Sequence, residues 1–103
     1  MKLTLSILSA ALLVSIPGAF AADAGATYKK HCASCHGADG KGQTKMGKQS
    51  GAVDYTTAKG QSWGDAQGVQ IILNGKGKMK GFASKGITDA DAKALVSFIR
   101  KFK

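Results

Sequence analysis

The chain has 103 residues and a formal net charge of +9, from 15 Lys and Arg against six Asp and Glu. This length allows one small domain and excludes two. The basic charge is compatible with nucleic acid, anionic lipid or acidic protein as partners, and a charge that only keeps the protein soluble is the alternative. Domains of this size often need a cross-link or a bound cofactor to complete their core.

The first 21 residues have the pattern of a secretory signal peptide. A positively charged start precedes a mostly apolar run, 3–16, and small residues follow it. Ala19 and Ala21 form a small-x-small pattern, so we expect cleavage after Ala21 and a mature domain over 22–103. Polar residues interrupt the apolar run, which is shorter than the roughly 20 residues of a spanning helix, so we expect no stable membrane anchor. We therefore expect a periplasmic protein, and export disfavours nucleic acid as a partner.

Two helices are indicated at the start and in the middle of this domain. Asp23 is placed to cap a helix through 26–32. In 65–75 the apolar residues have helical spacing, and Asn74 followed by Gly75 gives a C-terminal stop signal. Both segments are therefore predicted to be helical.

The clearest helical pattern lies at the C-terminal end, 87–103. Thr88 is a natural N-cap, and aspartates in the first turn suit the positive end of the helix dipole. An apolar stripe follows with helical spacing, formed by Leu95, Phe98, Ile99 and Phe102. This stripe predicts a helix that buries one face.

The remaining segments are predicted to be loops. Glycine and lysine dominate 37–51, and no run of useful length alternates as a strand would. The sequence therefore predicts an all-α fold with three to four helices and long, glycine-rich connections. Loops that form so much of a compact domain need a central organising element, and a cofactor would supply it.

The segment HCASCHG points to such a cofactor. Cys32, Cys35 and His36 form C-x-x-C-H, the attachment signature of c-type haem. Two thiols at this spacing can each add to one vinyl group of a porphyrin, and the next residue is placed to bring its imidazole to the iron. We therefore expect one covalently attached haem, with thioethers at Cys32 and Cys35 and with His36 as the proximal ligand.

Three other uses of the cysteine pair fit less well. A thioredoxin-like redox pair expects a βαβ pattern, which the sequence lacks. A zinc site needs four ligands, and beyond the motif only His31 and the aspartates are on offer. A structural disulfide would leave His36 without a role. Haem attachment is the interpretation that uses all three motif residues.

Over nearly all of the mature length, the chain resembles a small bacterial class I cytochrome c. The similarity rests on ATYKKHCASCHGADGKG at the front, GKGKMKGF before the end and the final DADAKALVSFIRKF. It implies a small cytochrome c fold, in which helices and long loops wrap around one haem and the first helix packs against the last. We accordingly expect Tyr28, Leu95 and Phe98 in the core, with Gly25 allowing the close approach.

The same resemblance implies that Met79 is the distal ligand. In that family a methionine far downstream of the motif binds the iron, commonly with an aromatic three residues later, and here Phe82 follows Met79 at that offset. Met46 is a weaker candidate, because the short loop between it and His36 would have to cross the porphyrin plane. His31 adjoins the motif and meets the same obstacle. A core role for Met79, the usual role of methionine, is the alternative.

A His/Met pair would leave no open position on the iron. A thioether favours the ferrous state and raises the reduction potential relative to two histidines. With no nucleophile or acid–base pair elsewhere, the chain is expected to carry single electrons between redox partners and not to be an enzyme. The alternatives are a haem-based sensor or ligand binder with a labile methionine, and a haem subunit of a larger redox complex.

The sequence departs from the family at two prolines. Many relatives have a proline after the motif whose carbonyl accepts a hydrogen bond from the proximal histidine, and a second proline directly after the distal methionine. Here the only proline is Pro17, and Lys80 follows Met79. We expect a carbonyl within Thr44 to Lys48 to replace the first proline as the partner of His36.

Two aromatic residues, Trp63 and Tyr55, fall where relatives often reach a haem propionate. Each is therefore a candidate for a propionate hydrogen bond, with plain packing as the alternative, because buried Trp and Tyr generally seek a polar partner.

Lysines are expected to steer docking onto larger redox proteins. They flank the expected distal ligand and follow the motif, at Lys76, Lys78, Lys80 and Lys85 and at Lys41, Lys45 and Lys48. They would attract an acidic surface on the partner, and a charged face with no docking role is the alternative. We expect the carrier to be a monomer.

Overall fold

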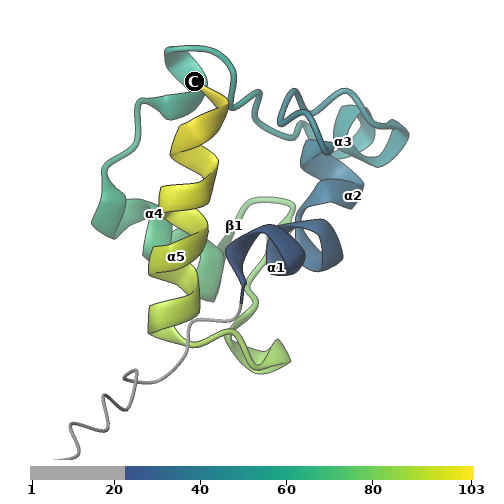
Figure 1. Ribbon diagram of the computed structural model, residues 1–103. Coiled ribbons are helices and arrows are strands. Elements are labelled where there is room, and N and C mark those ends of the chain that lie inside the picture. The colour runs from purple at the N-terminus through teal and green to yellow at the C-terminus, as the bar shows by residue number, and fades with distance from the viewer. Residues whose placement is uncertain (1–22) are drawn as a thin grey trace, which may run out of the picture.

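The computed structural model describes residues 23–103, so the expected signal peptide and its cleavage site lie outside the described residues. The described part contains five α-helices, one two-stranded hairpin and single turns of 3-10 helix (Figure 1). In chain order these are α1 (Ala24–His31), α2 (Ala33–His36), α3 (Lys45–Ser50), η1 (Lys59–Gln61), α4 (Asp65–Asn74), β1 (Gly75–Lys76), β2 (Met79–Lys80), η2 (Ala83–Lys85), α5 (Asp89–Ile99) and η3 (Arg100–Phe102). Within this part of the chain, every helix is too short or too polar to span a membrane.

The core lies where α5 packs against α1 and α4 (Figure 1). The ring of Tyr28 on α1 contacts Phe98 and Phe102, with centroid distances of 5.1 and 5.3 Å. A Cβ at Gly25 would lie 3.5 Å from the Phe98 ring, which is an ordinary van der Waals contact, so this approach does not require glycine. Tyr28 and Leu95 are buried and Phe98 packs against them, so the expected contact between the first helix and the last is confirmed.

α4 approaches α5 through a residue without a side chain. Gly68 is buried, and a Cβ there would overlap the Trp63 ring and lie 3.1 Å from Val96 of α5. Glycine inside a helix costs about 1 kcal/mol relative to alanine. That cost is offset here by the close packing that glycine permits.

The helix boundaries expected from the sequence are confirmed at three termini. Asp23 Oδ1 accepts a hydrogen bond of 3.0 Å from the backbone N–H two residues on, at the start of α1. Thr88 and Asp91 form a capping box at the start of α5, in which each side chain accepts from the other residue's backbone N–H, at 3.1 and 3.0 Å. α4 ends at Asn74, and Gly75 follows with a φ of 84°.

The prediction of a loop over 37–51 is wrong in its second half, where α3 forms. Thr44 caps this helix by accepting a hydrogen bond of 2.9 Å from Gly47 N–H, and Gly51 ends it with a φ of 69°. A short helix rich in glycine and lysine has no apolar stripe, so periodicity does not reveal it. α3 is one reason why the described part has more α-helices than the three to four expected. The other is the break at Cys32, which separates α1 from α2.

β1 and β2 form an antiparallel hairpin where no strand was expected. Gly75 pairs with Lys80 and Lys76 pairs with Met79. Gly77, with a φ of 57°, occupies the first central position of the turn, which is the position that a type II′ turn reserves for glycine. Strands of two residues are too short to show an alternating pattern, so the sequence does not indicate them.

Leu95 of α5 is almost fully buried, with 1% of its surface exposed. Leu95→Ala is expected to lower the free energy of unfolding by about 2–5 kcal/mol, because it removes buried methyl groups and leaves a cavity. Ser97→Ala, at an exposed position of the same helix, should change it by less than about 0.5 kcal/mol. Denaturant unfolding of the haem-loaded protein measures both, and equal effects would contradict the buried face assigned to α5.

Candidate haem site

The C-x-x-C-H motif lies where α1 and α2 meet (Figure 1). Cys32 is buried at the C-cap of α1, Cys35 lies partly exposed within α2, and both thiols are free. His36 is the last residue of α2 and is buried, and Gly37 ends the helix with a φ of 82°. The structure thus brings the three predicted haem-binding residues together around one short helix.

Side-chain hydrogen bonds hold the end of this short helix. The Tyr28 hydroxyl donates to the Gly37 carbonyl at 2.7 Å, and burial raises the pKa of Tyr28, so the hydroxyl keeps its proton and acts as a donor. The Thr44 hydroxyl lies within hydrogen-bonding distance of the Ser34 and Cys35 carbonyls, at 2.7 and 2.9 Å. These contacts fix the backbone that carries the motif.

The His36 ring has a partner at each nitrogen. Nδ1 lies 3.2 Å from the Val53 carbonyl oxygen, and because a carbonyl can only accept, Nδ1 carries the proton of this bond. Nε2 then has a lone pair, and the Tyr55 hydroxyl lies 3.3 Å away as its donor, with the two rings stacked at 4.5 Å and 20°. Burial lowers the pKa of His36, which favours the neutral imidazole that metals bind.

Val53 corrects the expectation that the carbonyl partner of His36 lies within Thr44 to Lys48. That segment turns into α3 directly after the motif, and the Lys48 N–H donates to the Thr44 carbonyl at 2.9 Å. The chain returns to the histidine only after α3 has ended. Any residue type can supply a backbone carbonyl, so no sequence signal identifies this partner.

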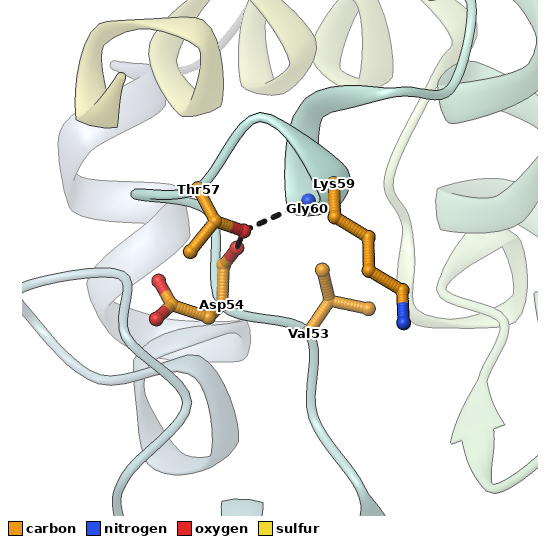
Figure 2. Close-up of a pocket in the computed structure, with 5 residues that line it drawn as sticks. All are labelled: Val53, Asp54, Thr57, Lys59 and Gly60. Atoms are coloured by element: carbon orange, nitrogen blue, oxygen red, sulfur yellow. Dashed lines mark hydrogen bonds between the residues drawn. The ribbon is translucent and has the colours of Figure 1, made fainter.

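The turn that carries Val53 is internally hydrogen-bonded and lines a surface pocket (Figure 2). Asp54 Oδ1 accepts from the N–H and the hydroxyl of Thr56 at 2.8 and 2.6 Å, and these bonds lower the pKa of Asp54. The Thr57 hydroxyl donates to the Asp54 carbonyl and accepts from the Gly60 N–H, both at 3.0 Å. The backbone on this side of His36 is therefore ordered by its own side chains.

The environment of the cysteines does not suit a redox pair. Burial, with a smaller contribution from Cys35, raises the pKa of Cys32 to about 11, whereas reactive thiols have a lowered pKa. Among residues 23–103, no three His, Cys, Asp or Glu side chains are grouped so as to hold a metal ion. The geometry therefore gives no support to the thioredoxin-like and zinc alternatives.

The two candidate sulfur ligands differ in burial. Met79 on β2 is partly buried and packs against the core, whereas Met46 on α3 is 56% exposed. His31 is partly exposed, and its ring lies 5.5 Å from that of Phe82. A distal ligand has to face the interior, so the burial pattern favours Met79 over Met46.

The two candidate propionate contacts also differ. The Trp63 indole N–H donates to the Gly60 carbonyl at 2.7 Å, so its one donor is used within the protein, and this favours the packing alternative for Trp63. Tyr55 is buried with its hydroxyl beside Nε2 of His36. A propionate contact stays a prediction for Tyr55.

Arg100 and Gln61, which were not predicted as site residues, link the segment that carries Tyr55 and Trp63 to the end of α5. Arg100 donates to the carbonyls of Gln61 and Trp63 at 2.8 and 2.6 Å. Gln61 in turn donates to the carbonyls of Tyr55 and Ile99 at 2.8 and 2.9 Å. The one available signal was that Arg100 is the only arginine in a lysine-rich chain, since arginine and lysine are not interchangeable where a planar fork of donors is needed.

A small helical domain with C-x-x-C-H at a helix junction and a buried histidine is a c-type cytochrome domain. The sequence profile of the family described as "Cytochrome C oxidase, cbb3-type, subunit III" matches residues 19–99. The chain belongs to this family. It is 36% identical over 83 residues to the Cbb3-type cytochrome c oxidase subunit CcoP of Azospirillum brasilense; the match covers 79% of this chain and 28% of CcoP. The chain thus spans less than a third of that relative's length.

Solved structures give the same class. The KustC0563 c-type cytochrome superposes with a TM-score of 0.72 at 34% identity, over 80% of this chain and 99% of that one. A mutant of the same cytochrome gives a TM-score of 0.70 at 33% identity, over 80% and 100%. These matches confirm the small cytochrome c fold, with covalently bound haem c as the cofactor and electron transport as the general role.

The residues of this chain fit that cofactor. Two free thiols at the motif spacing and a neutral imidazole with a lone pair on Nε2 are the donors that haem c takes. The hydrogen bond from His36 Nδ1 to Val53 selects this tautomer and orients the ring.

Proposed function

We propose that the chain is a periplasmic carrier of single electrons, in which Cys32 and Cys35 hold haem c and His36 and Met79 are the axial ligands. The proposal rests on the environment of His36. This residue is buried, it follows two cysteines with free thiols in the motif, and its Nδ1 proton is hydrogen-bonded to a carbonyl. The partial burial of Met79 supports its role as the second ligand. When bound, the haem supplies a reversible one-electron couple.

The protein side chains would orient the ligands and keep other molecules off the iron. The Val53 carbonyl raises the basicity of the His36 ring. The Tyr55 hydroxyl lies beside Nε2 of His36, where the iron would bind, so it would have to turn away from that nitrogen in the haem-loaded protein. We propose that a haem propionate then accepts its hydrogen bond.

Carbon monoxide tests whether both axial positions are filled by the protein. At neutral pH the ferrous protein should bind it slowly and incompletely, because Met79 has to leave first, and optical difference spectra measure this. Met79→Ala supplies the positive control, since it opens one position. Rapid, stoichiometric binding by the unmodified protein would contradict the carrier and favour a ligand binder with a labile methionine.

A contact between the hairpin and α3 supports the proposal that two groups of lysines form one surface. Lys78 Nζ donates to the Gln49 carbonyl at 3.4 Å, so the hairpin turn lies beside the end of α3. The exposed residues of this lysine surface are Lys41, Lys45, Lys48, Lys76, Lys78 and Lys80. We propose that this surface docks on an acidic surface of a larger redox protein.

Charge reversal on the lysine surface is expected to slow association with such a partner. Lys48→Glu with Lys80→Glu should reduce the rate at low salt by about tenfold or more, because steering of this kind raises on-rates by about 10–10³. Stopped-flow electron transfer at increasing ionic strength measures the effect. Lys93→Glu, on α5, with Lys103→Glu makes the same change in net charge elsewhere, and equal slowing by both pairs, or a rate independent of salt, would contradict the assignment.

The similarity to CcoP favours a second function, that of a haem subunit in a redox complex. Purification from the natural source distinguishes the two functions. A subunit should co-purify in fixed stoichiometry with larger redox proteins from its natural source, whereas a diffusible carrier should elute alone.

A further inference from the structure

We infer that Gln61 and Arg100 are positioning residues for the proximal histidine. They hold the backbone of 53–55 so that the Val53 carbonyl stays on Nδ1 of His36, and they thereby lower the reduction potential of the bound haem. The inference rests on the proposed ligation of the iron by His36.

The Arg100 guanidinium ties the segment after η1 to the end of α5. Nη1 donates to the carbonyl and to Oε1 of Gln61 at 2.8 and 2.9 Å, and Nη2 donates to the Trp63 carbonyl at 2.6 Å. Nη2 and Nε donate to Asp65 Oδ1 at 2.9 and 3.2 Å, and the guanidinium carbon lies 3.8 Å from the centre of the Trp63 ring. Only the planar fork of arginine can make these bonds together, because the lysine ammonium is a single point on a flexible stem.

The Gln61 side-chain amide connects Arg100 to the backbone of Tyr55, which lies beside His36. Its Nε2 donates to the Tyr55 carbonyl at 2.8 Å and to the Ile99 carbonyl at 2.9 Å, while its Oε1 accepts from Arg100. Both amide hydrogens and the amide oxygen are therefore used. One end of this bridge is the last residue of α5, and the other is the backbone of Tyr55.

Tyr55 and Val53 then act on His36 from one short stretch of backbone. The Tyr55 ring stacks on the imidazole at 4.5 Å, and the Val53 carbonyl lies 3.2 Å from Nδ1. The Tyr55 N–H donates to the Gly40 carbonyl at 2.7 Å, so the segment has a second attachment. Loss of the Gln61 bridge should therefore loosen the Val53 bond without abolishing it.

The strength of the bond to Val53 bears on the electronics of the iron. A hydrogen bond from Nδ1 to a carbonyl makes the imidazole a more basic ligand, and a more basic ligand stabilises ferric over ferrous iron. A looser bond should therefore raise the reduction potential and let the Nδ1 proton exchange faster with water.

Gln61→Met and Arg100→Lys in the haem-loaded protein test this, because both substitutions leave the net charge unchanged. The exchange of the His36 Nδ1 proton in the ferrous state, followed by ¹⁵N–¹H NMR, should become about tenfold faster, the size of effect expected when a hydrogen bond weakens. Voltammetry should show a higher potential for the same variants. Two controls should change neither quantity: Gln67→Met at an exposed position of α4 and Ile72→Val in the core.

The unmodified protein decides first whether the proposed ligation stands, since an iron-bound His36 must show ring resonances shifted strongly by the haem. If these shifts are missing, the ligation fails and the inference fails with it. If they are present and both variants keep the unmodified exchange rate and potential, the positioning role is overturned while the ligation stands. The positioning role is also overturned if Ile72→Val lowers the melting temperature as much as Gln61→Met and Arg100→Lys do and changes the exchange rate and the potential equally. If Gln61→Met does not fold, Arg100→Lys decides alone.

Discussion

Replacing Met79 with alanine is expected to remove the far-red absorption band of the ferric protein and to lower the reduction potential by on the order of 0.1 V or more. The band reports a bond between sulfur and iron, and the neutral thioether stabilises the ferrous state. Of the two methionines within residues 23–103, Met79 is the partly buried one, and it lies in a hairpin whose turn carries Gly77 at a positive φ. Optical spectra and voltammetry of the purified variant measure the two effects.

Met46→Ala is the matched control for this experiment. Met46 is 56% exposed on α3, and its removal should leave the band and the potential as they are. Loss of the band in Met46→Ala with its retention in Met79→Ala would exchange the two assignments. Retention in both would mean that neither methionine binds the iron.

Residues 22–103 produced without haem attachment are expected to be largely unfolded. A hydrophobic core in a domain of this size rarely supplies more than about 3–5 kcal/mol, and a cofactor that binds only the folded state adds its binding free energy to stability. The proposed ligands His36 and Met79 lie on elements far apart in the chain, so the bound haem would tie both to one centre. Far-UV circular dichroism on heating measures the difference between the haem-free and haem-loaded chains.

The haem-loaded form of the same residues serves as the control, so no substitution complicates this comparison. It should unfold in one cooperative transition. A cooperative transition in the haem-free chain, at a similar temperature, would show that the packing of α1 and α4 on α5 is sufficient and that the cofactor is not needed for the fold.

Local chemical signals made the main features of the fold predictable. Caps such as Asp23 and Thr88 use their own side chains to accept hydrogen bonds from backbone N–H groups two or three residues away, so their effect can be read from the sequence. The stripe that contains Leu95 identified the buried face of α5. The C-x-x-C-H motif has few other uses, and the family to which the chain belongs confirms haem c as the cofactor.

The features that escaped prediction depend on tertiary contacts. The bond from His36 to Val53 uses a backbone carbonyl, which every residue possesses. α3 has no apolar stripe, and the hairpin strands are shorter than one alternating repeat. The bridge from Arg100 through Gln61 joins residues 39 positions apart, and either residue viewed alone resembles an ordinary surface side chain.

The contacts around His36 suggest how one small fold could set different reduction potentials. The C-x-x-C-H motif specifies two thioethers and one histidine ligand, so the potential is set by the second axial ligand, the hydrogen-bond partners of the imidazole, the burial of the haem and the distortion of the macrocycle. In this chain the partner is a carbonyl in a turn that is ordered from within by Asp54 and Thr57 and from outside by Gln61. Substitutions in that turn would therefore be expected to change the potential without touching a ligand.

The optical spectrum of the purified protein, recorded in both oxidation states beside those of Met79→Ala and Met46→Ala, tests the central claim most directly. We predict sharp, low-spin bands of thioether-bound haem in the reduced protein and a far-red band in the oxidised protein that only Met79→Ala removes. A high-spin spectrum, or the lack of the far-red band in the unmodified protein, would contradict ligation by His36 and Met79.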